Sequence, residues 1–536
     1  MTLSEFDYVV VGGGSAGCCV AGRLSEDQHT SVCLLEAGGP DNSVFVRAPL
    51  GFAATASLNL NSWGYNTVPQ AGFNGRKGFQ PRGKVMGGSS SINAMVYTRG
   101  NARDYDSWAA LGNPGWSFQD VLPYFKKSEN NECFGATDYR GVGGPLNVSF
   151  LRSPSPLNQL FMKACNEQGI PSNPDYNGAQ QFGVSPGQVT QKDGERWNAA
   201  RAYLDPHRHQ SNLNVISHAH ATQIMFEGKR AVGIKYKVNG VDHEVRARKE
   251  VIVSGGAFGS PQLLMLSGVG PALHLQDLGI PLFHELPGVG QNLQDHITTV
   301  LIYKTQKIND AMGFSLKGAL NMVKAMLEWR SKRTGWITSN VSETQGFVST
   351  EGNNEHPNIQ LALCTGIVDD HARKMHAGHG YTLHVTLMRP QSRGSLTLAS
   401  RNPTDRPLID PAFFKESADM QTLVTATQLG LRVMQSPALS SHRGDMIHAV
   451  DANNPAQIES FLRDHSDTEY HPVGTCKMGP AQDPMAVVDA ELRVHGLQNL
   501  RVIDASIMPH LVTGNTNAPT IMIAEKGVDL IRGARL

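Results

Sequence analysis

The stretch YVVVGGGSAGCCVAGRL, residues 8–24, decides the fold of this chain. Its apolar run, residues 8–11, predicts a buried strand, and the residues after Gly14 predict a helix. Gly12, Gly14 and Gly17 fit the G-x-G-x-x-G pattern, which in this strand-turn-helix context indicates a dinucleotide-binding unit. Gly12 allows the tight turn, Gly14 lets the backbone approach a pyrophosphate, and Gly17 lets the helix lie close to the strand.

The residues around this turn predict how a dinucleotide is held. Ser15 and Ala16 open the helix, where free N–H groups and the helix dipole favour a phosphate. A second predicted strand, residues 31–35, ends in Glu36 and Ala37. The Glu36 carboxylate can accept a hydrogen bond from a ribose 2′-hydroxyl but repels a 2′-phosphate, which argues against NADP and leaves NAD and FAD open. A glycine-rich turn without a ligand is the alternative.

Composition limits the class of protein. A chain of 536 residues exceeds one compact core, which predicts two domains or one domain with large insertions. Lys plus Arg and Asp plus Glu both number 47, so no net charge points to nucleic acid. Seven cysteines without a C-x-x-C pair predict neither a disulfide framework nor a zinc site. His218 and His220 share a predicted strand but lack partners at ligand spacing, so we expect no metal.

The sequence also predicts where the protein resides. Residues 1–7 are short and polar and lead directly into the first strand, so we expect no signal peptide. No run of about eighteen apolar residues predicts a membrane span. We therefore expect a cytoplasmic protein.

Two further motifs carry a family resemblance. Residues 83–106 and the stretch GAFGSPQLLMLSGVG, residues 256–270, resemble the two signatures of the glucose-methanol-choline (GMC) oxidoreductase family. The similarity covers nearly the whole chain and is strongest to the branch of bacterial choline dehydrogenases and membrane-associated aliphatic alcohol dehydrogenases. It implies FAD, bound with its flavin ring beside residues 87–96. Some members attach FAD through a histidine where this chain has Ile92, so the implied FAD is non-covalent. The implied contacts in this stretch are Gly87, Gly88, Ser91, Asn93, Ala94, Met95 and Val96.

The resemblance places the catalytic residues near the C-terminal end. His471 stands in the stretch that carries the family's catalytic histidine. A neutral imidazole, with an ordinary pKa near 6.5, suits a base that takes the hydroxyl proton while hydride passes to flavin N5. Asn517 is assigned as the donor of a hydrogen bond to the substrate oxygen. His296 has a suitable side chain but is interpreted as structural. Further cofactor contacts are expected from Ala221, Asp504, Ala505, Asn515, Thr516, Asn517 and Thr520.

The resemblance and the order of predicted elements together give the fold class. We expect an α/β, Rossmann-like, doubly wound FAD-binding domain that is discontinuous in sequence, and an α+β substrate domain with an antiparallel sheet. The FAD-binding domain is assigned residues 1–155, 195–305 and 466–536. The substrate-binding domain is assigned residues 156–194 and 306–465.

The implied function is oxidation of a primary alcohol, aliphatic or polyether-like, to its aldehyde by an FAD-dependent alcohol dehydrogenase. A quinone or another acceptor would take the electrons. Glu343 falls in a pocket-lining stretch of the family, where a carboxylate can attract a choline ammonium or anchor a loop, so choline ranks below a neutral alcohol. An oxidase that uses dioxygen and a lyase in which FAD is a bystander remain as alternatives. The specific alcohol and the oligomeric state are not predicted.

Residues 315–333 predict a basic amphipathic helix. Leu316, Leu320, Val323 and Leu327 form one apolar stripe, and five Lys and Arg residues lie elsewhere on the helix. Such a helix can lie in a membrane interface, which would make the protein peripheral on the inner face of the cytoplasmic membrane. The more common arrangement, and the one we expect, is a helix packed on its own domain.

Overall fold

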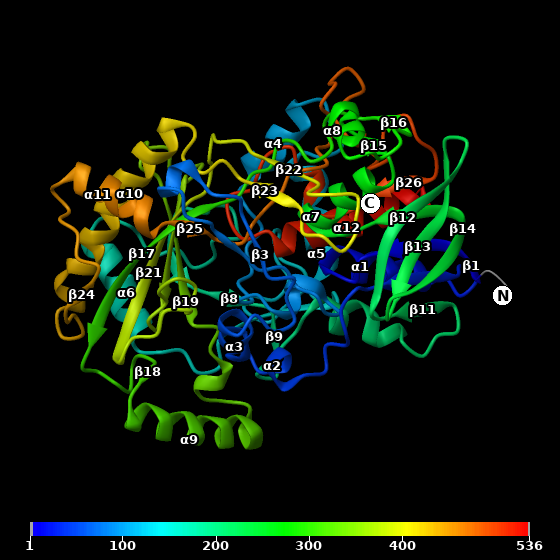
Figure 1. Ribbon diagram of the computed structural model, residues 1–536. Helices are drawn as coiled ribbons and strands as arrows, with labels where there is room; N and C mark the ends of the chain where they lie inside the picture. Colours follow the sequence, from blue (N-terminus) through cyan, green and yellow to red (C-terminus); the bar gives the residue numbers. More distant parts are fainter. Residues whose placement is uncertain (1–3, 534–536) are drawn as a thin grey trace.

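The structure is a computed structural model that describes residues 4–533. Within these residues it contains a seven-stranded sheet and an eight-stranded sheet, together with several small ones. The two large sheets lie at opposite ends of the molecule (Figure 1). Together with their helices they confirm the predicted fold class.

The seven-stranded sheet contains the dinucleotide-binding unit. Its strands are β1 (Ser4–Val11), β2 (Val32–Leu35), β11 (Leu213–Ile216), β12 (Ala219–Glu227), β13 (Arg230–Val238), β14 (Val241–Val253) and β26 (Leu500–Val502). The strand order is β11-β2-β1-β14-β13-β12, and β26 also pairs with β14. The pairs β1–β2, β1–β14, β2–β11 and β14–β26 are parallel, whereas β12, β13 and β14 pair antiparallel. The parallel strands are apolar because both faces of the sheet are covered.

Three helices next to this sheet carry or support the cofactor turn: α1 (Ser15–Ser25), α7 (Gly256–Leu266) and α12 (Asn517–Arg532). At Gly17 an added Cβ would lie 1.8 Å from the carbonyl oxygen of Gly12, so only glycine permits this approach of α1 to β1. Gly12 itself has φ +100°, in the region that favours glycine. An ion pair of 2.8 Å between Arg23 and Glu525 joins α1 to α12, so the two ends of the chain meet beside the turn.

The eight-stranded sheet is antiparallel. Its strands are β7 (Gly183–Pro186), β17 (Ile297–Thr305), β18 (Gly313–Phe314), β19 (Ser342–Val348), β20 (Ile359–Cys364), β21 (Gly378–Leu387), β24 (Met446–Ile447) and β25 (Asp467–Thr468). The helices α6 (Leu157–Glu167), α10 (Ser417–Gln435) and α11 (Pro455–His465) share one apolar core with it. The predicted boundary at residue 305 assigned β17 to the FAD-binding domain, but β17 pairs with β21 over its whole length. β25 also pairs with β17, so the last segment of the FAD-binding domain begins a few residues after the predicted boundary at residue 466.

The remaining helices lie between or outside the two sheets. They are α2 (Val44–Arg47), α3 (Gly51–Ser57), α4 (Ala102–Ala110), α5 (Phe118–Ser128), α8 (Ala272–Asp277) and α9 (Leu316–Lys332). The small strands are β3 (Tyr65–Asn66), β4 (Phe79–Gln80), β5 (Glu129–Asn131), β6 (Leu146–Phe150), β8 (Gln188–Val189), β9 (Gln191–Lys192), β10 (Glu195–Arg196), β15 (Val269–Gly270), β16 (His284–Glu285), β22 (Ser395–Thr397) and β23 (Leu408–Asp410).

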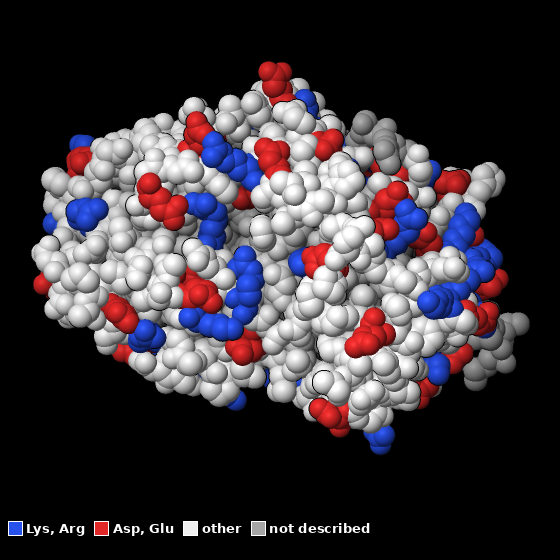
Figure 2. Space-filling model, turned by 90° about the horizontal axis from the view of Figure 1, so that it is seen from above, with Lys and Arg blue, Asp and Glu red and all other residues white. Residues whose placement is uncertain are grey.

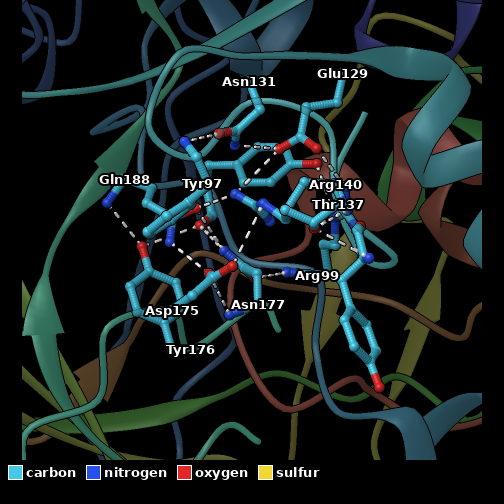
Figure 3. Close-up of polar contacts among 12 residues, drawn as sticks. Tyr97, Arg99, Glu129, Asn131, Thr137, Arg140, Asp175, Tyr176, Asn177 and Gln188 are labelled. Atoms are coloured by element: carbon cyan, nitrogen blue, oxygen red, sulfur yellow. Dashed lines mark hydrogen bonds and ion pairs between the residues drawn. The ribbon is translucent and has the colours of Figure 1, made fainter. Parts of the chain in front are cut away.

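A buried polar cluster fixes the segment that follows the predicted flavin contacts. Glu129 forms ion pairs with Arg99 at 2.6 Å and with Arg140 at 3.1 Å, and all three side chains are almost fully buried. Figure 3 shows these groups gathered with Tyr97 and Asn177. Asn177 accepts a hydrogen bond from the backbone N–H of Arg99 at 2.8 Å. The Glu129 carboxylate thus balances the charge of two buried guanidinium groups. Asp175, whose carboxylate lies 3.6 Å from the Arg140 guanidinium, is a second anion in the cluster.

The surface carries no large charged field on the face seen in Figure 2, where Lys and Arg are interspersed with Asp and Glu. Across residues 4–533, none of the helices combines the length and apolar character needed to span a bilayer.

Helix α9 differs from the expected packing. It lies at the edge of the molecule (Figure 1). The predicted apolar stripe faces solvent, with Leu316 90%, Leu320 63% and Leu327 64% exposed. A different face, with Ala325 and Trp329, packs against the body. The helix therefore packs on its own domain, as expected, but through this second face and not through the predicted apolar stripe.

Candidate active site

One cavity of about 1410 Å³ connects the two halves of the molecule. Its walls run from the turn at Gly12 and Gly14, at the carboxyl end of β1, to His471 beside the antiparallel sheet. Ligand pockets for small molecules commonly measure about 300–1,000 Å³. The cavity is therefore large enough for an extended cofactor together with a substrate.

Glu36 closes the cavity at the dinucleotide end. One carboxylate oxygen accepts the N–H of Gly13 at 2.8 Å and the other accepts that of Gly38 at 2.7 Å. These bonds hold the side chain at the end of β2, and burial raises its pKa to about 7. Each oxygen keeps acceptor capacity for a ribose hydroxyl. Ala37 and Ala221 line the same end.

Most of the predicted cofactor residues line this cavity. They are Gly12, Gly14, Ser15, Ala16, Glu36, Ala37, Gly88, Asn93, Ala94, Met95, Val96, Ala221, Asp504, Ala505, Asn515, Thr516, Asn517 and Thr520. Gly17, Gly87 and Ser91 do not line it. Gly17 packs α1 against β1, and Ser91 donates a hydrogen bond of 2.6 Å to the carbonyl of Met86 behind the wall. Gly87 supplies a left-handed turn with φ +86°.

Asn515, rather than Asn517, lies next to His471. The side-chain nitrogen Nδ2 of Asn515 is 3.0 Å from Nε2 of His471. Asn517 is the first residue of α12, and its Oδ1 accepts a hydrogen bond of 2.7 Å from the Ser15 hydroxyl at the cofactor turn. The sequence analysis assigned Asn517 as the donor of a hydrogen bond to the substrate oxygen beside His471, but the structure brings Asn515 next to the histidine instead. The helix start separates the two asparagines, because Asn515 is still in the loop.

His296 is in direct contact with His471, which the sequence interpretation missed. The two Nδ1 atoms are 3.0 Å apart, and the rings are nearly perpendicular, at 84°. The Nε2 atom of His296 lies 3.0 Å from the carbonyl oxygen of Met388. A carbonyl only accepts, so His296 carries its proton on Nε2, and burial lowers its pKa to about 4 and keeps it neutral.

This geometry fixes the proton on His471. Because Nδ1 of the neutral His296 is an acceptor, Nδ1 of His471 is the donor, and Nε2 of His471 is unprotonated and carries a lone pair. That lone pair faces the cavity beside Asn515, whose amide donates to it. Burial, with smaller contributions from His296 and Arg82, holds the pKa of His471 well below its usual value. His471 is thus a neutral acceptor at physiological pH.

The backbone around His471 is held by a second set of contacts. The backbone N–H of His471 donates to Oδ1 of Asp295 at 2.9 Å, and Arg82 donates to the carbonyl of Tyr470 at 2.7 Å. Tyr470 has φ +68°, a conformation that a non-glycine residue adopts only when its surroundings impose it. Burial raises the pKa of Asp295 to about 6, although hydrogen bonds from Gln80 and Thr468 oppose this.

The acidic side chains in and near the cavity already have partners. Asp504 accepts hydrogen bonds from Ser260 at 2.5 Å and from the N–H of Gly256 at 2.8 Å. Glu469 lies 3.3 Å from His384, which lowers the pKa of the glutamate against the effect of burial. Glu343, the candidate ammonium ligand, does not line the cavity.

Glu343 instead anchors loops. It accepts the N–H of Ser155 at 2.8 Å and the side-chain amide of Asn158 at 2.6 Å. The second of the two roles predicted for it, a loop anchor, is the one that its contacts fit.

Comparisons with known proteins agree with this architecture. The chain is 44% identical to the alcohol dehydrogenase (acceptor) of Pseudomonas putida, over 98% of this chain and 95% of that protein. It is also 44% identical to the mitochondrial choline dehydrogenase of Homo sapiens, over 99% of this chain and 90% of that protein. The crystal structure of pyridoxine 4-oxidase from Mesorbium loti superposes with a TM-score of 0.88 and 30% identity, covering 99% of this chain and 100% of that one.

Family assignment rests on two matched segments. Residues 6–298 match the N-terminal part and residues 390–524 the C-terminal part of the GMC oxidoreductases, a family of FAD flavoproteins. These segments hold the dinucleotide turn, the histidine pair and Asn515. The chain therefore belongs to the GMC oxidoreductase family.

Proposed function

We propose that this protein is an FAD-dependent dehydrogenase that oxidises a primary alcohol to its aldehyde. One observation carries the proposal: the unprotonated Nε2 of His471, with the amide of Asn515 3.0 Å away, faces the cavity that also contains the dinucleotide turn. FAD, when bound, supplies the hydride acceptor. The protein supplies the base, the cavity and the hydrogen bonds that orient the alcohol.

The cavity wall fits FAD held without a covalent bond. An added Cβ at Gly88 would lie 2.6 Å from the Cα of Gly14, so the two glycine turns approach each other closely, as a flat or phosphate-bearing ligand requires. α1 directs its N-terminus at the same turn, where free N–H groups favour phosphate. Ile92, at the position of the family's attachment histidine, cannot form a covalent link to the flavin.

His471 accepts the hydroxyl proton at Nε2. An alcohol that replaces the Asn515 amide at this atom can donate its O–H to Nε2 and accept a hydrogen bond from Nδ2 of the same asparagine. The amide then stabilises the negative charge that develops on the oxygen as the proton leaves. His296 keeps the imidazole in the tautomer that can accept the proton.

A neutral alcohol suits the cavity better than choline. An unpaired carboxylate in the cavity would attract a quaternary ammonium. In the described residues, the cavity carboxylates Glu36, Asp504 and Glu469 have the partners given above, and Glu343 is outside the cavity. Choline remains the second candidate substrate, because several relatives at 42–44% identity are choline dehydrogenases, from mitochondria and from bacteria.

We further propose that α9 docks the protein to the inner face of the cytoplasmic membrane, where a quinone would accept the electrons. Met322, Met326 and Trp329 of α9 line the cavity, while Leu320 and Leu327 on the outer face are more than 60% exposed. Basic residues on the same helix are attracted to the anionic lipids of that leaflet, with about 1 kcal/mol for each Lys or Arg near the surface. A lipid-soluble acceptor would then enter beside the docked helix.

Vesicle binding tests the docking. Leu320→Glu with Leu327→Glu should abolish cosedimentation with phosphatidylglycerol-containing vesicles, because two apolar anchors become anions. The matched control is Leu273→Glu on α8, where the leucine is 78% exposed and lies elsewhere on the surface. Equal binding of both variants would contradict the docking proposal and leave the alcohol reaction untouched.

Anaerobic mixing with an alcohol tests the reaction. The yellow flavin should bleach with primary alkanols or with polyethers that end in a primary alcohol. A protein that consumes substrate without bleaching of the flavin would instead be a lyase. Admitting air separates the remaining alternatives. Slow recolouring supports a dehydrogenase, whereas fast recolouring with peroxide would identify an oxidase.

A further inference from the structure

A second group of metal-ligating side chains lies outside the histidine pair. Oδ2 of Asp369 is 2.7 Å from Nε2 of His376 and 2.9 Å from Nε2 of His448. These three ligand atoms lie within 4.8 Å of one another. The Asp369 side chain is 4% exposed and the two imidazoles 25% and 29%, so the group is sheltered but reachable from solvent.

Several residues at and beside these ligands have positive φ angles. Asp369 and His376 are the first and last residues of the segment 369–376, which lies in the loop between β20 and β21. His448 directly follows β24. Asp370, His371 and Ala372 have successive φ angles of 47°, 60° and 60°, and His448 has φ 58°. Non-glycine residues in this left-handed region are strained, and such strain gathers at ligand clamps and functional sites.

A stacked ring fixes the orientation of one ligand. His465, at the end of α11, stacks on His448 with the ring centroids 4.3 Å apart and the planes 30° apart. The nearby pair of His371 with Asp467 differs, because both ring nitrogens of His371 are engaged, one by Asp467 at 2.9 Å and the other by the Tyr470 hydroxyl. We therefore consider only the Asp369 group as a metal site.

We propose that Asp369, His376 and His448 bind a divalent transition metal of the zinc class. Two imidazoles and one carboxylate suit zinc, nickel or copper, whereas magnesium and calcium prefer oxygen ligands. Tetrahedral bonds of about 2.0–2.1 Å to nitrogen place ligand atoms roughly 3.3 Å apart, so the present contacts open by about half an ångström. The metal replaces the Nε2 protons between the imidazoles and the carboxylate, and water completes the coordination.

The site would cross-link the rim of the substrate cavity. Val368, Ala372, Lys374 and His376 line that cavity, and the metal would tie their loop to the segment after β24. No sequence motif indicates the site, because its ligands come from segments about seventy residues apart. This proposal does not depend on the alcohol reaction.

Calorimetric titration of the FAD-loaded protein with zinc chloride tests the proposal. We expect one equivalent to bind, and His376→Ala and His448→Ala each to weaken it at least tenfold. His442→Ala is the matched control, because His442 also contacts a single carboxylate, Asp310, at 3.0 Å, and its loss should leave binding unchanged. Binding that survives both site variants, or that is lost in His471→Ala instead, would overturn the proposal.

Limited proteolysis gives a second readout that does not depend on activity. Arg373 and Lys374 are exposed within the loop, so trypsin can cut there. Zinc should slow this cleavage severalfold in the wild-type protein and in His442→Ala, but not in His448→Ala. Equal zinc protection in His448→Ala would contradict a cross-linked loop.

Discussion

Replacing His296 with phenylalanine should impair proton removal although His296 never touches the substrate. In the wild-type protein the Nδ1–H of His471 donates to Nδ1 of His296 over 3.0 Å. Phenylalanine removes this acceptor and leaves a buried N–H without a partner. The imidazole of His471 is then stabilised by moving its proton to Nε2, the atom that must accept the hydroxyl proton.

The size of the effect follows from the cost of the lost bond. A buried donor without a partner costs about 1–3 kcal/mol, and each 1.36 kcal/mol corresponds to a tenfold change in rate. We therefore expect flavin reduction to slow about 5- to 150-fold. His296→Asn should recover most of the rate, because its amide oxygen occupies about the position of Nδ1 and can accept the same proton.

Anaerobic stopped-flow measurement of flavin bleaching at saturating alcohol is the appropriate assay, with FAD content matched between variants. His379→Phe controls for loss of a buried histidine, since His379 contacts Ala311 and Ser315 instead. A wild-type rate of flavin reduction in His296→Phe would refute the tautomer assigned to His471. So would a rate in His296→Asn that is as slow as in His296→Phe.

Three further predictions concern the asparagines, acid stability and the buried ion cluster. Asn515→Ala should lower kcat/KM about 10²- to 10³-fold in steady-state assays, whereas Asn517→Ala should mainly weaken FAD retention on gel filtration; the reverse pattern would contradict our assignment. His296 has its pKa lowered to about 4, so the native state binds fewer protons than the unfolded state below pH 6.5, and its contribution to stability is lost as the pH falls. Urea unfolding at pH 7 and 4.5 should show a decrease about 2.5 kcal/mol larger in wild type than in His296→Asn, and equal decreases would argue against a buried neutral histidine. Glu129→Gln should lower the free energy of unfolding by about 3–5 kcal/mol, because it leaves Arg99 and Arg140 without their shared carboxylate; a loss below 1 kcal/mol would exclude this role.

The opening unit was predictable because its signals are local. Residues 8–17 combine a buried strand, three glycines and a helix start, and the close approach of Gly17 to Gly12 is a contact between residues five positions apart. Glu36 was predictable for the same reason, since it ends the next strand of the unit.

The errors lie where tertiary contacts decide. Asn515 and Asn517 are two residues apart with the same side chain, and only the start of α12 directs one to His471 and the other to Ser15. The contact between His296 and His471 joins residues 175 positions apart. The 3.6-residue period located α9 but could not say which of its two apolar faces packs inward.

The central claim is that His471 removes the hydroxyl proton of the alcohol. The most direct test is single-turnover flavin reduction in His471→Ala, purified with FAD bound and mixed anaerobically with a primary alcohol. Our account predicts that the flavin bleaches about 10²- to 10⁴-fold more slowly than in the wild-type protein while FAD remains bound. Bleaching at the wild-type rate would contradict it.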